Sequence, residues 1–101
     1  MKVIRNNVSL SALFLITLPK WLNTVDSIDG YFSCSNNELI SLINCPKNIR
    51  GHFMCVNNKL MTLDGCPKEV LGNFYCGNNP GNFTEADVRK VCKVNGRVYC
   101  S

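Results

Sequence analysis

A pattern of apolar and polar positions repeats every 21 residues through the middle of the chain. Each repeat begins with Gly-x-Phe-x-Cys, continues through Asn-Asn and two leucines, and ends in Cys-Pro-Lys-x-(Ile or Val). The aligned residues are Gly30, Gly51 and Gly72; Phe32, Phe53 and Phe74; Cys34, Cys55 and Cys76; and Asn37, Asn58 and Asn79. A fixed period of this length predicts stacked repeats, because one unit is too small to bury its own apolar face.

The alternation in Gly-x-Phe-x-Cys predicts one short strand per repeat, with Phe and Cys pointing into the core. Stacked repeats would pair these strands into a parallel sheet with a strand spacing of about 4.8 Å. We expect the second asparagine of each pair to turn inward and satisfy buried backbone groups at the bend, so that phenylalanine, cysteine and asparagine form a core ladder. The proline that follows favours a loosely wound, irregular return arc.

These motifs resemble a known family. The stretch Phe32-x-Cys34-x-x-Asn37-x-Leu39-x-x-Leu42-x-x-Cys45-Pro46-x-x-Ile49, with its copy from Phe53 to Val70, resembles the short leucine-rich repeats of bacteria. The Gly-x-Phe-x-Cys-x-Asn-Asn wording further resembles small repeat proteins of T-even-like bacteriophages. The resemblance implies an α/β-type repeat solenoid of about three turns, with repeats at 30–50 and 51–71 and a partial one at 72–83. It also implies that the strand face binds another protein, plausibly of the bacterial host, to inhibit host machinery or an antiviral defence.

The two ends depart from the repeat, so we expect caps at residues 1–29 and 84–101. In the first segment, Leu10, Leu13, Leu15, Leu18, Trp21 and Leu22 are expected to close the open end of the core. In the second, Thr84 and Asp87 form a capping-box pattern for a helix at about 85–92, whose inner face would carry Val88, Val91 and Cys92. Asn95-Gly96 then predicts the turn of a terminal hairpin.

Strand alternation assigns a set of side chains to the outer face of the sheet. Several are apolar or aromatic where a merely solvated surface would favour charge, and tyrosine and methionine are enriched in interface cores. We therefore expect this face to bind a protein partner. Its predicted members are Tyr31, Ser33, His52, Met54, Val56, Asn73 and Tyr75.

The seven cysteines are interpreted as small hydrophobic residues, because no His, Asp or close Cys-x-x-Cys pair accompanies them as zinc ligands would. The pair most suited to a disulfide in an oxidising compartment is Cys92 and Cys100. His52 and Cys55 fall on opposite faces of their strand, so they cannot form a nucleophilic pair. We expect neither a metal or cofactor nor enzymatic activity.

Charge and hydropathy leave two alternatives open. The net charge is +4, and the basic residues Arg89, Lys90, Lys93 and Arg97 crowd the C-terminal segment, which is compatible with a nucleic-acid-binding accessory protein. The apolar run at 12–18 is too short to span a membrane, so no membrane association is expected. Lys2 and Arg5 ahead of that run resemble a weak signal peptide, but no cleavage site follows. A cytoplasmic protein is therefore favoured over a secreted, disulfide-linked binder.

Overall fold

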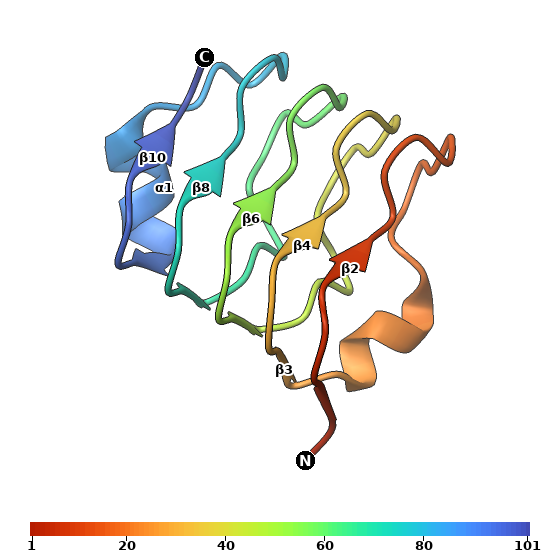
Figure 1. Ribbon diagram of the computed structural model, residues 1–101. Coiled ribbons are helices and arrows are strands. Elements are labelled where there is room, and N and C mark those ends of the chain that lie inside the picture. Colours follow the sequence, from red (N-terminus) through yellow and green to blue (C-terminus); the bar gives the residue numbers. More distant parts are fainter.

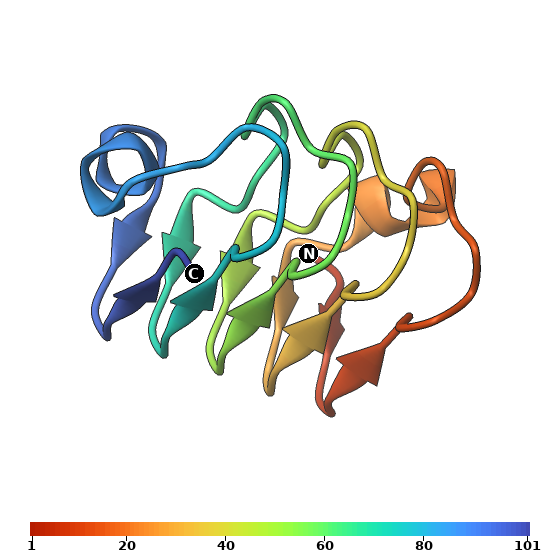
Figure 2. The same cartoon turned by 90° about the horizontal axis from the view of Figure 1, so that it is seen from above.

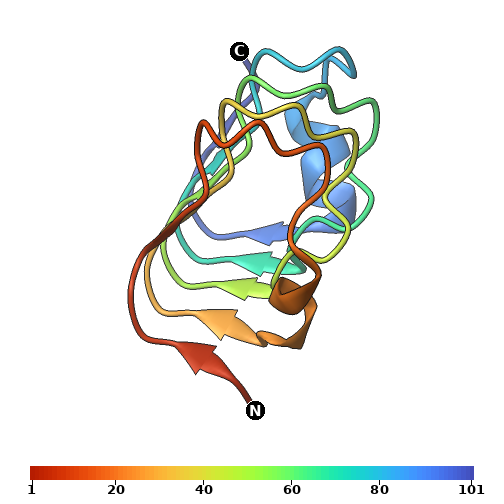
Figure 3. The ribbon, with the colours of Figure 1, turned by 90° about the vertical axis from the view of Figure 1, so that its right-hand side faces the viewer.

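The computed structural model describes residues 1–101 and consists of two five-stranded parallel sheets, one α-helix and one short 3-10 helix (Figure 1). The strands of the first sheet are, in spatial order, β1 (Val3–Ile4), β3 (Ser27–Ile28), β5 (Asn48–Ile49), β7 (Glu69–Val70) and β9 (Lys93–Val94). Those of the second are β2 (Val8–Ser9), β4 (Phe32–Ser33), β6 (Phe53–Met54), β8 (Phe74–Tyr75) and β10 (Val98–Tyr99). The view along the stack shows the two sheets as adjoining walls, with the return arcs closing the other sides (Figure 3).

We call each passage of the chain through both sheets a coil, so that coil 1 holds β1 and β2 and coil 5 holds β9 and β10. In every coil the second strand begins five residues after the first, as in positions 27 and 32 or 48 and 53. Because this spacing never changes, both sheets keep the same register from one coil to the next. The coils therefore lie side by side like layers of one continuous stack (Figure 2).

The phenylalanine column expected from the 21-residue period is confirmed. Phe32, Phe53 and Phe74 are fully buried and pair in register, with ring centroids 6.0 Å apart between the first two and 5.0 Å apart between the last two. Val8 and Val98 extend the column at its two ends. One apolar row therefore runs through all five coils and forms the centre of the core.

The inward asparagines are confirmed as well. The carboxamide nitrogen of Asn58 donates to the carbonyls of Cys34 and Cys55 at 3.0 and 3.2 Å, and its oxygen accepts from the Leu39 amide at 3.0 Å. Asn37 and Asn79 make the equivalent bonds in their own coils. Each buried side chain thus satisfies backbone groups of two coils, which explains why the position is polar inside an apolar core.

The second sheet was not expected. Sequence analysis predicted a single short sheet with irregular return arcs, yet Ile28, Ile49 and Val70 lie in regular parallel strands of their own. These strands contain only two residues each, so no apolar alternation is long enough to reveal them. Their β-branched side chains nevertheless fit an extended backbone, and all three are buried.

The N-terminal segment joins both sheets. β1 pairs with β3 and β2 pairs with β4, and the 3-10 helix η1 (Lys20–Thr24) forms part of the return arc. Leu18 and Leu22 are buried as expected, but Leu13 and Trp21 are 53% and 49% exposed, so their assignment to the core was wrong. Leu13 lies between Ala12 and Phe14, which both have positive φ, in a turn that no further coil covers.

The C-terminal helix α1 (Glu85–Val91) begins as the sequence predicts. The Thr84 hydroxyl accepts from the Asp87 amide, the Asp87 carboxylate accepts from the Thr84 amide, and the latter bond lowers the pKa of Asp87. Val88 and Cys92 are buried, whereas Val91 is 52% exposed, so placing it on the inner face was wrong. Val91 lies three residues beyond Val88, and the helix ends there before another turn can cover it.

The predicted terminal hairpin is absent. β9 pairs in parallel with β7, and β10 pairs in parallel with β8, so the two strands never pair with each other. Asn95 and Gly96 form the corner between the sheets, because the chain completes a fifth coil instead of folding back on itself.

Candidate functional site

The outer side of the sheet β10-β8-β6-β4-β2 is the candidate site, and we call it the strand face. It consists of the seven predicted residues together with Tyr99, namely Tyr31, Ser33, His52, Met54, Val56, Asn73, Tyr75 and Tyr99. Of these, Tyr31, His52 and Tyr99 are exposed, four are partly buried, and one is buried. The strand face lies on the outside of one wall of the stack (Figure 3).

Three rings form an aromatic cluster on the strand face. The rings of Tyr75 and Tyr99 stack with centroids 4.9 Å apart, and His52 meets Tyr75 edge-on at 6.1 Å. The three residues come from β8, β10 and the loop before β6, so neighbouring coils bring them together. Rings held against each other present a large, rigid contact area that loses little side-chain entropy on binding.

Backbone bonds fix the positions of the polar members. The Nδ1 atom of His52 accepts from the Asn73 amide at 2.9 Å, and the Asn73 carboxamide oxygen accepts from the Arg97 amide at 2.9 Å. The Asn73 carboxamide nitrogen also donates to the Tyr75 hydroxyl at 3.2 Å. The bond from Asn73 places the proton of a neutral His52 on its other ring nitrogen, so the imidazole is oriented by the backbone of the next coil.

Ser33 does not belong to the exposed surface. Its side chain is only 7% exposed, and its hydroxyl lies 2.8 Å from the hydroxyl of Ser11. The expectation that it is accessible was wrong because coil 1, which sequence analysis treated as an irregular cap, extends the sheet and covers it.

Sequence analysis missed Tyr99. The signal was present, since Gly96-Arg97-Val98-Tyr99-Cys100 matches Gly72-Asn73-Phe74-Tyr75-Cys76 at an offset of 24 residues. A search restricted to the 21-residue period cannot find this copy, because the segment containing α1 lengthens the coil.

A second exposed apolar feature lies on the return arcs, and sequence analysis did not identify it. Ile16, Ile40 and Met61 occupy equivalent positions in three successive coils, and each is more than half exposed. The Ile40 amide donates to the Ile16 carbonyl at 3.3 Å, which fixes the first two as neighbours. We call these three residues the arc column.

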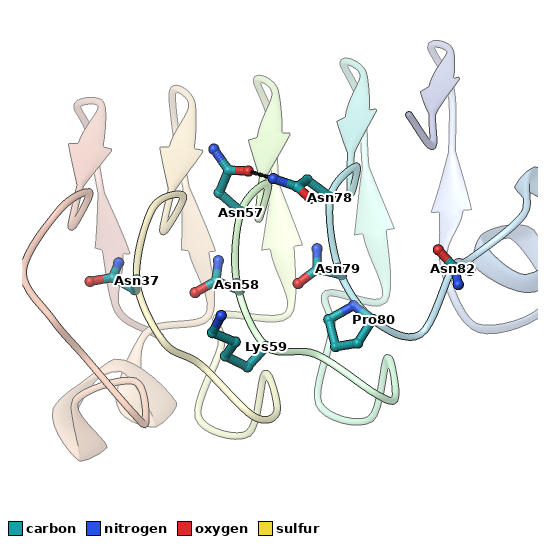
Figure 4. A pocket seen from close by; sticks show the side chains of 8 residues that line it. All are labelled: Asn37, Asn57, Asn58, Lys59, Asn78, Asn79, Pro80 and Asn82. Atoms are coloured by element: carbon teal, nitrogen blue, oxygen red, sulfur yellow. Dashed lines mark hydrogen bonds between the residues drawn. The ribbon is translucent and has the colours of Figure 1, made fainter.

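A polar groove of about 510 Å³ runs along the asparagine turns (Figure 4). It is lined by Asn37, Asn57, Asn58, Lys59, Asn78, Asn79, Pro80 and Asn82. The inner asparagines use their amide groups on the backbone, and Asn78 donates to Asn57, which in turn donates to Asn36. Because most of these amides are already engaged with protein, we interpret the groove as part of the scaffold and not as a binding site.

The seven cysteines are free thiols arranged in two interior groups. One column contains Cys34, Cys55, Cys76 and Cys100, and the other group contains Cys45, Cys66 and Cys92. Burial raises the pKa of the Cys34 and Cys76 thiols to about 12 and that of Cys66 to about 11. Thiols with such pKa values are protonated at neutral pH, whereas thiolates are the nucleophiles and the metal ligands.

The described residues contain no group of three histidine, cysteine or acidic side chains that could hold a metal ion. The expected separation of His52 from Cys55 is confirmed, because the histidine is exposed and the cysteine is completely buried. None of the helices is long and apolar enough to cross a membrane. No protein-family model, curated protein sequence or solved structure matches the chain.

Proposed function

We propose that this chain is a leucine-rich-repeat solenoid without enzymatic activity that binds another protein through the strand face. The aromatic cluster of His52, Tyr75 and Tyr99 carries the proposal, because it places rigid, partly exposed rings side by side on a regular sheet. Aromatic side chains in such positions are the residue type that contributes most binding energy at protein interfaces.

The charge of the strand face narrows the chemistry of the partner. No carboxylate occupies its outward positions, while Arg97 lies on the same strand segment as Tyr99 and His52 adds a second titratable base. A partner that offers apolar contacts and acidic residues would therefore complement this surface best. The resemblance of the repeats to bacteriophage proteins supports a partner from a bacterial host, with inhibition by occlusion as the mode of action.

Single-stranded nucleic acid is the second candidate, because Arg97 lies beside stacked tyrosines and bases stack on aromatic rings. Against it, Arg89 of the basic segment is engaged by Glu85 and by two backbone carbonyls of its own chain. Fewer basic groups therefore remain to contact phosphates than the sequence suggests.

The test is capture from bacterial lysate on immobilised protein, followed by mass spectrometry. We compare the wild type with the double variant Tyr75→Ala/Tyr99→Ala and with Met61→Ala, which removes an equally exposed apolar side chain from the arc column. The proposal expects one or a few proteins that the double variant loses and that Met61→Ala retains. Loss of all captured material on nuclease treatment, or a steep decline with salt, would instead favour nucleic acid.

A further inference from the structure

We propose that Arg89 and Asn6 close the two ends of the stack and prevent a second copy of this chain from adding to it end to end. Both sheets end in open edges, at β1 and β9 in one and at β2 and β10 in the other. Open parallel edges are templates for further strands, so some feature of the chain must keep the ends apart.

The two ends would otherwise match each other closely. Coil 5 and coil 1 both space their strands by five residues, so Lys93 could face Val3 of a second copy while Val98 faces Val8. The same register would place Val94 against Ile4 and Cys100 against Leu10, continuing the interior apolar rows. Ile4, Val8, Leu10, Val98 and Cys100 are the core side chains left only partly buried at the two ends.

Arg89 occupies the place of the missing next coil. Along the first sheet, the carbonyls of Ile4, Ile28, Ile49 and Val70 accept from the amides of Asp29, Arg50, Leu71 and Asn95. The next carbonyl in this series belongs to Val94, and it accepts from the Nη1 atom of Arg89 at 2.7 Å. A side-chain donor thus replaces the backbone amide that a sixth coil would supply.

The same guanidinium also closes the corner. The carbonyls of Gly30, Gly51 and Gly72 accept from the amides of Gly51, Gly72 and Gly96 at 2.9 to 3.0 Å. The following carbonyl, that of Gly96, accepts from the Nη2 atom of Arg89 at 3.1 Å. Glu85, one helical turn earlier, holds the Nε atom at 2.8 Å, so the planar group is fixed across both acceptors.

Asn6 blocks the other end by steric conflict. Each coil after the first has glycine at the corner, and a Cβ atom at Gly51 would lie 2.6 Å from the Gly30 carbonyl oxygen. A Cβ at Gly72 would lie 2.7 Å from the Gly51 carbonyl oxygen, so the corner of one coil leaves no room for a side chain on the next. Coil 1 has Asn6 at this position, and its Cβ would meet the Gly96 carbonyl of a preceding copy.

The test exploits the fact that a contact between two copies needs one end from each. Arg89→Ala opens only the C-terminal end and Asn6→Gly only the N-terminal end, so each variant alone is expected to remain monomeric. An equimolar mixture should give a complex of twice the mass, and the double variant should grow into longer assemblies as its concentration rises. Light scattering after size exclusion measures these masses, and Lys90→Ala and Asn57→Gly are the matched controls.

Amide hydrogen exchange identifies the contact. In the mixture, the Val98 and Cys100 amides of the Arg89→Ala copy should become protected by at least tenfold, because they lie on the β10 edge that the second copy would cover. Circular dichroism confirms that each variant is folded, and Arg89→Met, which keeps the apolar stem of the side chain, replaces Arg89→Ala if needed. A folded double variant that stays monomeric at millimolar concentration, or a wild type that already associates end to end, would overturn the proposal.

Discussion

The ring of Tyr99 lies parallel to the ring of Tyr75, with 10° between their planes and 4.9 Å between their centroids. The two residues are 24 positions apart in the sequence and become neighbours because β10 pairs with β8 in register. The last strand of the chain therefore completes the aromatic cluster that starts in the central repeats.

The tyrosine pair should contribute to stability as well as to binding. Replacing Tyr99 with Ala removes the stacked ring from an edge strand, and we expect the free energy of unfolding to fall by about 0.5–1.5 kcal/mol. Tyr99→Phe keeps the ring and should stay close to the wild type. Urea unfolding measures both, and equal losses for the two variants would show that the hydroxyl, not the stacking, is responsible.

The inner asparagines should be far more sensitive than their exposed neighbours. Asn58→Ala leaves two carbonyls and the Leu39 amide without their side-chain partner inside the core, and we expect a loss of about 3 kcal/mol or more. The matched control is Asn57→Gly, at an exposed position with φ of 57° that glycine adopts without strain. A loss for Asn57→Gly as large as that for Asn58→Ala would contradict the importance of the buried bonds.

The phenylalanine column predicts a third contrast. Phe53 is completely buried between the rings of Phe32 and Phe74, so Phe53→Ala should destabilise the protein by about 3–5 kcal/mol. Met61 is 69% exposed, and Met61→Ala should change the free energy of unfolding by less than about 0.5 kcal/mol. A substantial loss for Met61→Ala in urea unfolding would indicate that the arc column packs against the protein itself.

Alkaline pH should unfold the protein through its thiols. Burial raises the pKa of the Cys34 thiol from 9.0 to about 12 in the folded state, and the pKa of Cys55 is raised well above 9.0. The folded state therefore holds these protons more tightly than the unfolded state, so their contribution is complete below pH 9 and is lost as pH rises toward the folded pKa.

Each such thiol adds about 1.4 kcal/mol of lost stability per pH unit in that window. We expect Cys55→Ala to be less stable at pH 7 and to have a shallower decline between pH 9 and pH 11, as followed by urea unfolding at each pH. The control is the slope between pH 6 and pH 8, which should be the same in both proteins. An unchanged alkaline slope in the variant would assign the decline to other groups.

The sequence identified the interior of the central repeats because those positions obey an unbroken 21-residue period. Phe53, Cys55 and Asn58 were placed correctly since each must fill the same space as its neighbour one coil away. The capping box at Thr84 was also correct, because it depends only on local hydrogen bonds.

Features that depend on the altered period were missed. The first and last coils are 24 residues out of step with their neighbours, so Val8 and Val98 were not recognised as continuations of the phenylalanine column. Asn95-Gly96 has the local signature of a hairpin, yet pairing with two existing edges satisfies the backbone of both terminal strands and leaves them no reason to pair together. The position of Tyr99 followed from the same oversight.

The asparagine turns impose an order on synthesis. The amide of Leu60 finds its partner only in Asn79, nineteen residues further along, just as Leu39 depends on Asn58. A ribosome must therefore deliver nearly a whole additional repeat before the preceding bend can be completed. Until then the newest bend of the nascent chain stays unfinished, and each layer is locked only by the arrival of the next.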